Sequence, residues 1–154
     1  MFGVFMNGCL FCKIIKNEIP SKKVYENSDT LAFLDINPAN PGHTLVMPKK
    51  HAENIFDIDE DSLKSTISVV KEMAKSIKEK MNAVGINIVQ NNGKYAGQLV
   101  NHVHFHVIPR FENDNVIISY KRVQLSEKEL DDLAKKIVQA PPAKKTDDWD
   151  LSGL

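Results

Sequence analysis

The segment that begins at Asp59 has the clearest periodic pattern of apolar and polar positions in the chain. Its apolar residues step by four and three along one stripe, which is the spacing of one face of an α-helix. Acidic residues stand near its start and lysines follow later, where they complement the helix dipole. The stripe predicts one long amphipathic helix and consists of Leu63, Ile67, Val70, Ala74, Ile77 and Met81.

Two shorter segments have the same periodicity. Between Cys9 and Asn17 apolar residues recur at intervals of three and four, so we expect a short helix that ends before Pro20. A last helix is expected to open at Ser126, because Ser126 and Glu129 have the spacing of a capping box. Its apolar face would consist of Leu130, Leu133 and Ile137.

Five further stretches predict β-strands, three by their β-branched and aromatic residues and two by alternation. They cover residues 24–25, 30–35, 43–47, 85–90 and 102–108, and residues 111–123 are compatible with one more strand at an edge. Strands, a helix, more strands and a last helix, without a repeated strand-helix-strand unit, indicate an α+β fold with a mainly antiparallel sheet.

The balance of charge narrows the classes of ligand. The chain has 154 residues, enough for one domain with a core, and its 20 basic residues balance 20 acidic ones. It offers no broad positive field to a nucleic-acid polymer, which leaves a small anionic ligand at a local site open. Residues 1–6 are too short for a signal-peptide core, and no run approaches the roughly 20 apolar residues of a membrane span. We therefore expect a cytoplasmic protein.

The same patterns predict how the chain is divided. We expect an N-terminal extension over residues 1–8 and a single domain over residues 9–140. Residues 141–154, which open with prolines, lysines and aspartates, are expected to form a flexible tail.

Three of the five histidines lie in residues 102–108, at His102, His104 and His106. On a strand, alternate side chains point to one face, so we expect the three imidazoles on one side and Val103, Phe105 and Val107 on the other. A chance arrangement is improbable because histidine is scarce. Two functional interpretations stay open: the histidines bind one metal that activates water, or one of them is a nucleophile that the others orient.

Cys9 and Cys12 form a C-x-x-C pair. In a reducing compartment such a pair is a metal half-site or a redox pair more often than a structural disulfide, and two free thiols are the simplest alternative. A zinc ion held by two cysteines and two histidines would have a closed, structural coordination shell.

The histidine segment resembles the signature of the histidine triad (HIT) family of nucleotide hydrolases and transferases. Residues 33–38, residues 41–51, Asn91 and the pair Gly97-Gln98 also resemble this family in content, order and spacing. Residues 41–51 are most similar to the Hint branch, whose members are typically purine nucleoside phosphoramidases. The resemblance implies a five-stranded antiparallel sheet with helices, in a homodimer whose sheets join.

The resemblance also implies a role for individual residues. His104 would be the nucleophile that forms a nucleotidyl-histidine intermediate at the α-phosphate, with His106 beside the phosphate and His43 orienting the triad. An adenosine phosphoramidate would be cleaved to AMP. The residues implied in nucleotide binding are Phe33 and Ile36 at the base, Asp35 at the ribose, Asn91, Gly97, Gln98 and Leu99 near the sugar or phosphate, and His106.

Local explanations exist for several of these residues. Asp35 is also placed to cap the turn before Pro38, Gly97 to turn the chain, and Phe33 and Ile36 to fill the core. Leu99 departs from the family, where many Hint-like proteins have a serine or threonine that hydrogen-bonds the phosphate or leaving group. Leaving-group preference is therefore an open question.

A zinc site is the last feature that the resemblance implies. In bacterial-type relatives with a C-x-x-C pair, the ligands correspond to Cys9, Cys12, His51 and His102. Such a zinc ion would be structural and would stay away from the phosphorus. Two other functions stay open, a dinucleoside polyphosphate hydrolase and a nucleotide-binding regulator with little turnover.

Overall fold

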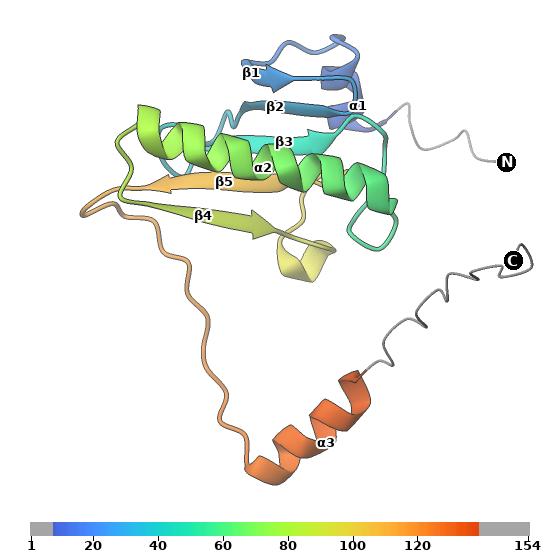
Figure 1. The fold of residues 1–154 in the computed structure, drawn as a ribbon, viewed down its shortest axis with the longest axis vertical. Coiled ribbons are helices and arrows are strands. Elements are labelled where there is room, and N and C mark those ends of the chain that lie inside the picture. Colours follow the sequence, from blue (N-terminus) through green and yellow to red (C-terminus); the bar gives the residue numbers. More distant parts are fainter. Residues whose placement is uncertain (1–7, 139–154) are drawn as a thin grey trace, which may run out of the picture. The chain divides into compact units, whose positions relative to one another are not determined.

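The computed structural model describes residues 8–138, and the chain divides into two compact units, one ending at Ile117 and one beginning at Ile118. The expected tail and residues 1–7 of the expected extension lie outside the described residues. The elements of the first unit, labelled in Figure 1, are α1 (Leu10–Ile15), β1 (Lys23–Glu26), β2 (Thr30–Leu34), β3 (Thr44–Pro48), α2 (Glu60–Lys80), β4 (Gly85–Gln90), the 3₁₀ turn η1 (Lys94–Ala96) and β5 (Phe105–Arg110).

The first unit is built on one five-stranded sheet with the strand order β1-β2-β3-β5-β4. All four pairings are antiparallel, so the predicted α+β fold with an antiparallel sheet is confirmed. The central strand β3 pairs with β2 along its whole length, from Thr44 to Pro48, but with β5 only from Thr44 to Val46. The shorter pairing leaves the segment before β5 free to take another path.

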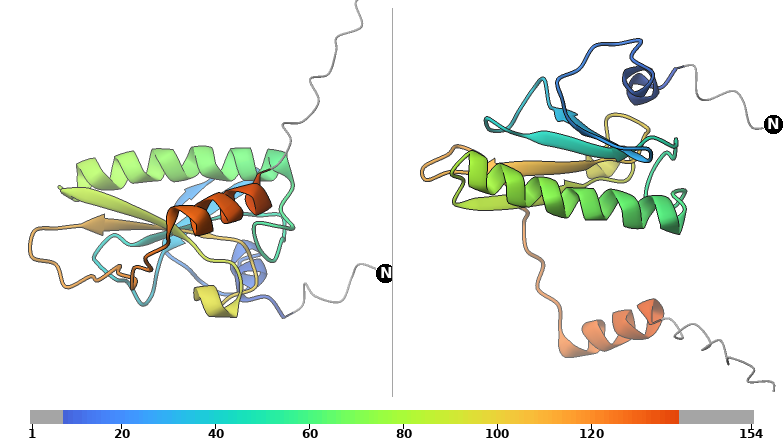
Figure 2. Two further views of the ribbon diagram at one scale, coloured as in Figure 1. Left: turned by 90° about the horizontal axis from the view of Figure 1, so that it is seen from below. Right: turned by 45° about the horizontal axis from the view of Figure 1, so that its top comes forward.

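Two apolar clusters lie on the two faces of the sheet. Val69, Val70 and Met73 of α2 pack on one face, and Phe11 and Ile14 of α1 pack on the other. Figure 2 shows α2, in green, and α1, in dark blue, on opposite sides of the strands. Because α1 leaves much of its face of the sheet uncovered, this face has room for a ligand.

The long helix α2 confirms the strongest prediction from the sequence. Asp59 is its N-cap, and the Asp59 side chain accepts a hydrogen bond from the backbone N–H of Ser62. The predicted apolar stripe was wrong in part, because Ile67 is 44% exposed and Met81 39% exposed. The helix is buried instead along Thr66, Val69, Val70 and Met73, and a polar Thr66 in that face is invisible to a count of apolar residues.

The prediction of one strand over residues 102–108 was also wrong, since β5 begins at Phe105. Continuing the register of β3 and β5 would place Pro48 opposite Val103. Pro48 has no N–H to donate, and the backbone N–H of Val103 instead donates to the carbonyl of Ala52 at 2.8 Å. Two of the three triad histidines, His102 and His104, therefore precede the strand.

The second unit contains α3 (Glu127–Ile137). Ser126 and Glu129 form the predicted capping box, with hydrogen bonds in both directions. None of the α3 residues is buried, including its apolar Leu130 and Leu133. The edge strand considered for residues 111–123 does not form. None of the described helices is long and apolar enough to cross a membrane.

Candidate active site and metal centre

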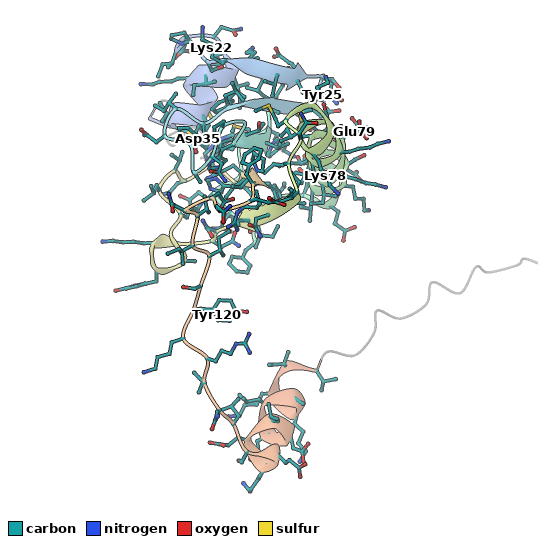
Figure 3. The ribbon with its side chains drawn as sticks, turned by 90° about the vertical axis from the view of Figure 1, so that its left-hand side faces the viewer. Lys22, Tyr25, Asp35, Lys78, Glu79 and Tyr120 are labelled. Carbon is teal, nitrogen blue, oxygen red and sulfur yellow. The ribbon has the colours of Figure 1, made fainter. Side chains whose placement is uncertain are left out.

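A cavity of about 300 Å³ opens on the α1 side of the sheet. Figure 3 shows Asp35, one of its lining residues, on the side of the sheet away from Lys78 and Glu79 of α2. Most of the wall is apolar, and its main contributors are Leu10, Phe11, Ile14, Phe33, Leu45 and Val100. The polar side chains that line it are Ser21, Asp35, Asn37, His104 and His106. Within the described chain, no lysine or arginine lines this cavity.

Aromatic contacts join the apolar wall to the histidines. The ring of Phe11 meets Phe33 edge to face, with centroids 5.7 Å apart, and meets His104 in the same way at 5.1 Å. One α1 side chain therefore packs against both β2 and a triad histidine. An apolar wall with aromatic members suits the flat face of a nucleobase.

Hydrogen bonding and burial hold His104 as a neutral imidazole whose Nε2 keeps its lone pair. Its Nδ1 lies 2.7 Å from the backbone carbonyl oxygen of His102. Because a carbonyl only accepts hydrogen bonds, Nδ1 carries the proton and Nε2 keeps its lone pair. Burial lowers the pKa of His104, against opposing effects of the His102 carbonyl and the Asp35 carboxylate. His104 thus presents an unprotonated nitrogen near neutral pH.

His106 has the opposite tautomer, which follows from its contact with His43. The backbone N–H of Ala39 donates to Nδ1 of His43 at 3.0 Å, so the proton of His43 is on Nε2. That Nε2–H donates to Nδ1 of His106 at 2.9 Å, which leaves the proton of His106 on its own Nε2. Burial, helped by His104 and His43, lowers the pKa of His106 to about 4. His106 therefore offers a hydrogen-bond donor beside the lone pair of His104.

Asp35 makes the local cap that the sequence suggests, and its carboxylate also lies beside His43. One carboxylate oxygen accepts a hydrogen bond from the backbone N–H of Asn37 at 2.9 Å, which is the local cap. The other oxygen lies 3.7 Å from Nε2 of His43. Asp35, His43 and His106 have ligand atoms close enough together for a metal ion. However, the 2.9 Å contact between His43 and His106 is a hydrogen bond that already uses the lone pair of His106 Nδ1.

The loop between β4 and β5 is braced by Gln98 and turned by Gly97. The Gln98 amide accepts from the backbone N–H of Gly93 and donates to the carbonyls of Glu53 and Val100. Gly97 caps η1 with φ of +86°, a left-handed conformation that favours glycine. Gln98 thus acts on the loop, whereas Gly97 and the 93% exposed Leu99 line the cavity.

The second group of interest brings together the four predicted metal ligands. Sγ of Cys12 lies 3.3 Å from Nδ1 of His51 and 3.6 Å from Nδ1 of His102, and the two Nδ1 atoms are 3.3 Å apart. Sγ of Cys9 lies 3.6 Å from Nδ1 of His102. In a tetrahedral zinc site, bonds of about 2.3 Å to sulfur and about 2.0 Å to nitrogen place two nitrogen ligands about 3.3 Å apart and a nitrogen and a sulfur ligand about 3.5 Å apart. These spacings fit a Cys₂His₂ metal site.

The surroundings of this Cys/His cluster also suit a metal. Nε2 of His102 lies 2.8 Å from the carbonyl oxygen of Pro48, so Nε2 carries the proton and Nδ1 has a free lone pair toward the sulfurs. Burial lowers the pKa of His102 to about 4, which keeps it neutral. Burial and the neighbouring Cys9 raise the pKa of Cys12 to about 11. A thiolate at this position therefore requires a positive partner, which a divalent cation supplies.

The structure separates the predicted nucleotide-site residues into two sets. The cavity is lined by Phe33, Asp35, Ile36, Gly97, Leu99, His104 and His106. His43, Asn91 and Gln98 are not in its lining. Sequence reasoning missed Leu10, Phe11 and Ile14 as cavity residues, because their spacing was fully explained by helix packing.

Comparison with known proteins gives the family. A family model described as the HIT domain matches residues 16–113. An uncharacterized HIT-like protein of Methanocaldococcus jannaschii is 51% identical over 129 residues, which cover 84% of this chain and 98% of that protein. The adenosine 5'-monophosphoramidase of Saccharomyces cerevisiae is 41% identical over 84% of this chain and 80% of its own length.

Solved structures agree with these relatives. A Streptococcus mutans protein has a TM-score of 0.83 at 41% identity, covering 89% of this chain and 87% of that one. A zinc-bound histidine triad family protein of Mycobacterium smegmatis has a TM-score of 0.69 at 33% identity, covering 85% and 99%. The family match spans the sheet and all three triad histidines, and we conclude that this chain belongs to the HIT domain family.

Proposed function

We propose that this protein is a Hint-like purine nucleoside phosphoramidase, a hydrolase that cleaves an adenosine phosphoramidate and releases AMP. The observation that carries the proposal is the pair of opposite tautomers in one cavity, a free nitrogen lone pair on His104 and an N–H donor on His106. The yeast relative named adenosine 5'-monophosphoramidase supports the same activity.

In the proposed first step, Nε2 of His104 attacks the α-phosphorus and the bond from phosphorus to the amine nitrogen breaks. The departing amine takes one proton from water, and the nucleotide remains on His104. His106 donates a hydrogen bond from Nε2 to a phosphoryl oxygen, where charge accumulates. The low pKa of His106 keeps this residue a neutral donor instead of a second cation.

In the second step, water attacks the phosphorus and the bond to His104 breaks. The water proton returns to solvent, so the two steps together consume one water and yield amine and AMP. His104 leaves as the neutral imidazole that its buried position favours. An imidazole is a competent nucleophile and a good leaving group in the same site.

The cavity lining favours an amine over a polyphosphate as the leaving group. In an in-line displacement the leaving group departs opposite the attacking His104, which is 6% exposed, and so toward the mouth. Two exposed apolar residues of the lining, Ile36 and Leu99, stand at the mouth. Among the described lining residues there is no lysine or arginine for the charges of a departing polyphosphate. The dinucleoside polyphosphate hydrolase is therefore the weaker candidate.

We also propose that the Cys/His cluster holds zinc. Cys9, Cys12, His51 and His102 would bind it, and the zinc-bound relative supports this assignment. When bound, the metal would supply a coordination cross-link between α1 and the segments that follow β3 and precede β5. A homodimer with joined sheets is a further proposal, supported by β4, an edge strand that pairs only with β5 among the described strands.

The first experiment is mass spectrometry after brief mixing with an adenosine phosphoramidate, together with a measurement of AMP release. We expect a transient acid-labile adenylyl adduct and AMP from the wild type, and neither from His104→Ala. The surface variant Lys128→Ala serves as the matched control and is expected to behave as the wild type. If nucleotide binds but neither adduct nor AMP forms, the proposed activity is refuted and a binding regulator becomes the better account.

A further inference from the structure

Helix α1 belongs to both of the sites described above. Cys9, at its N-cap, and Cys12 are members of the Cys/His cluster. Leu10, Phe11 and Ile14, interleaved with them in the sequence, line the cavity. The six residues of α1 therefore connect the metal centre to the wall of the nucleotide site.

The helix has little to hold it in place by itself. Isolated helices shorter than about 12 residues are marginal in water, and Cys9 gives α1 no side-chain cap. Within residues 9–19, the backbone hydrogen bonds beyond the helix itself run only between members of that segment, from Lys13 to Cys9 and from Ile19 to Lys13, for example. The position of α1 on the sheet thus depends on side-chain packing and on the cluster.

The apolar packing of α1 and the Cys/His cluster both position the α1 side chains that line the cavity. Phe11 and Ile14 belong to the apolar cluster that also contains Phe33 and Leu45, and all four line the cavity. Phe11 is flanked in the sequence by Leu10 and the ligand Cys12, and its ring also lies edge to face on His102, with centroids 6.0 Å apart. A shift of the cluster would therefore move the wall directly.

We propose that metal binding by the Cys/His cluster sets the affinity of the cavity for the nucleobase, with Cys9 and Cys12 as positioning residues that act through α1. The inference rests on the proposed function in assuming that a nucleotide occupies the cavity. The side chains that α1 places there are all apolar, and they suit a base. The histidines at the proposed phosphate position, His104 and His106, belong to β5 and the segment before it.

This division of labour predicts a selective effect. Removal of the metal loosens the base wall directly, whereas α1 reaches a ligand without a base only indirectly, through the packing of Phe11 on His104. Stacking of a base on an aromatic side chain is worth a factor of about ten in affinity. We therefore expect the Kd for AMP to rise about tenfold in metal-free protein, with the Kd for ribose 5-phosphate changed less than about twofold.

The test is a pair of NMR titrations, with AMP and with ribose 5-phosphate, on zinc-loaded, chelator-treated and zinc-reloaded protein. Amide hydrogen exchange of Phe11–Ile15 is measured on the same samples, and faster exchange in the metal-free sample is expected. Reloading should restore both readouts. Equal weakening of the two ligands would overturn the inference, because the metal would then support the whole site and not the base wall.

Two variants separate positioning from general stability. Ile14→Ala removes part of the wall but no metal ligand, so it should weaken AMP binding at full zinc content, and chelation should add less to this loss than in the wild type. Val70→Ala creates a cavity in the α2 cluster on the other face, and should lower thermal stability with unchanged AMP affinity.

The outcomes also separate this inference from the proposed function. Tight AMP binding that is unchanged on metal removal, in protein that stays folded, overturns the inference alone. Failure of zinc-loaded protein to bind AMP overturns the proposed function and the inference with it. A loss of AMP affinity in Val70→Ala as large as in Ile14→Ala would also refute a specific role for α1.

Discussion

The imidazole Nδ1 of His104 lies 2.7 Å from the main-chain carbonyl oxygen of His102, whose side chain belongs to the Cys/His cluster. His102 thus serves the proposed metal centre with its side chain and the candidate nucleophile with its backbone. The carbonyl decides which nitrogen of His104 carries the proton. The two sites are therefore linked through one residue, His102.

The hydrogen bond from His43 to His106 should matter for the rate more than for binding. In His43→Ala, Nδ1 of His106 loses its donor and the tautomer is no longer fixed, so we expect kcat to fall about 10- to 100-fold. His43→Gln retains an N–H donor and should recover part of the loss. Steady-state AMP release gives kcat, and equal losses in both variants would contradict a role in setting the tautomer.

Stability should decrease as the pH falls from about 6.5 to about 4. The folded protein lowers the pKa of His106 from its ordinary value of 6.5 to about 4, so in this window the unfolded chain binds more protons than the folded one. The contribution is complete above pH 6.5. Urea unfolding of zinc-loaded protein at several pH values measures the slope.

His106→Asn removes this titration and keeps a polar side chain. Its free energy of unfolding should fall less steeply over the same pH window than that of the wild type. Parallel slopes for the two proteins would show that other groups, and not His106, carry the pH dependence.

Removal of zinc should lower the midpoint of thermal unfolding by about 10 °C, since a ligand at a thousandfold excess over its Kd stabilises by about 4 kcal/mol. Differential scanning calorimetry with and without chelator measures the change. The double variant Cys9→Ser and Cys12→Ser should have the lower midpoint of thermal unfolding already without chelator, and chelator should not change it. A wild-type midpoint that does not respond would argue that the thiols are free.

Leu99 should influence the choice of leaving group. Leu99→Lys places a cation at the rim of a cavity whose described lining has no lysine or arginine. We expect kcat/KM for diadenosine triphosphate to rise severalfold relative to an adenosine phosphoramidate, and the gain to shrink with added salt. Leu99→Gln is the uncharged control. A preference unchanged by the lysine would place the leaving group away from this rim.

Periodic segments could be predicted from the sequence, whereas features that depend on a distant partner could not. The α2 helix and β4 follow from local spacing alone. The start of β5 depends on Pro48, more than fifty residues earlier, and becomes visible only when the two strands are paired. The buried hydrogen bonds of Gln98 link it to Glu53 in the same non-local way.

The four proposed metal ligands are a non-local feature that could be predicted, through the family resemblance. His51 and His102 are far in the sequence from each other and from Cys9 and Cys12, and spacing by itself identifies only the C-x-x-C pair. Their proximity in the structure matches what the family resemblance implies. The cavity role of Phe11 had no such guide, because an apolar residue on a short helix has a sufficient explanation in packing.

The proline that ends the ladder between β3 and β5 has a consequence for anyone who wishes to build this chemistry into another scaffold. In an uninterrupted sheet, the carbonyl of His102 would point toward a neighbouring strand. Nδ1 of His104 would then have no backbone acceptor for its proton. Three histidines grafted onto an ideal strand would share a face yet sample both proton placements. Reproducing the proposed nucleophile therefore requires copying the interruption of the strand as well as the histidine motif.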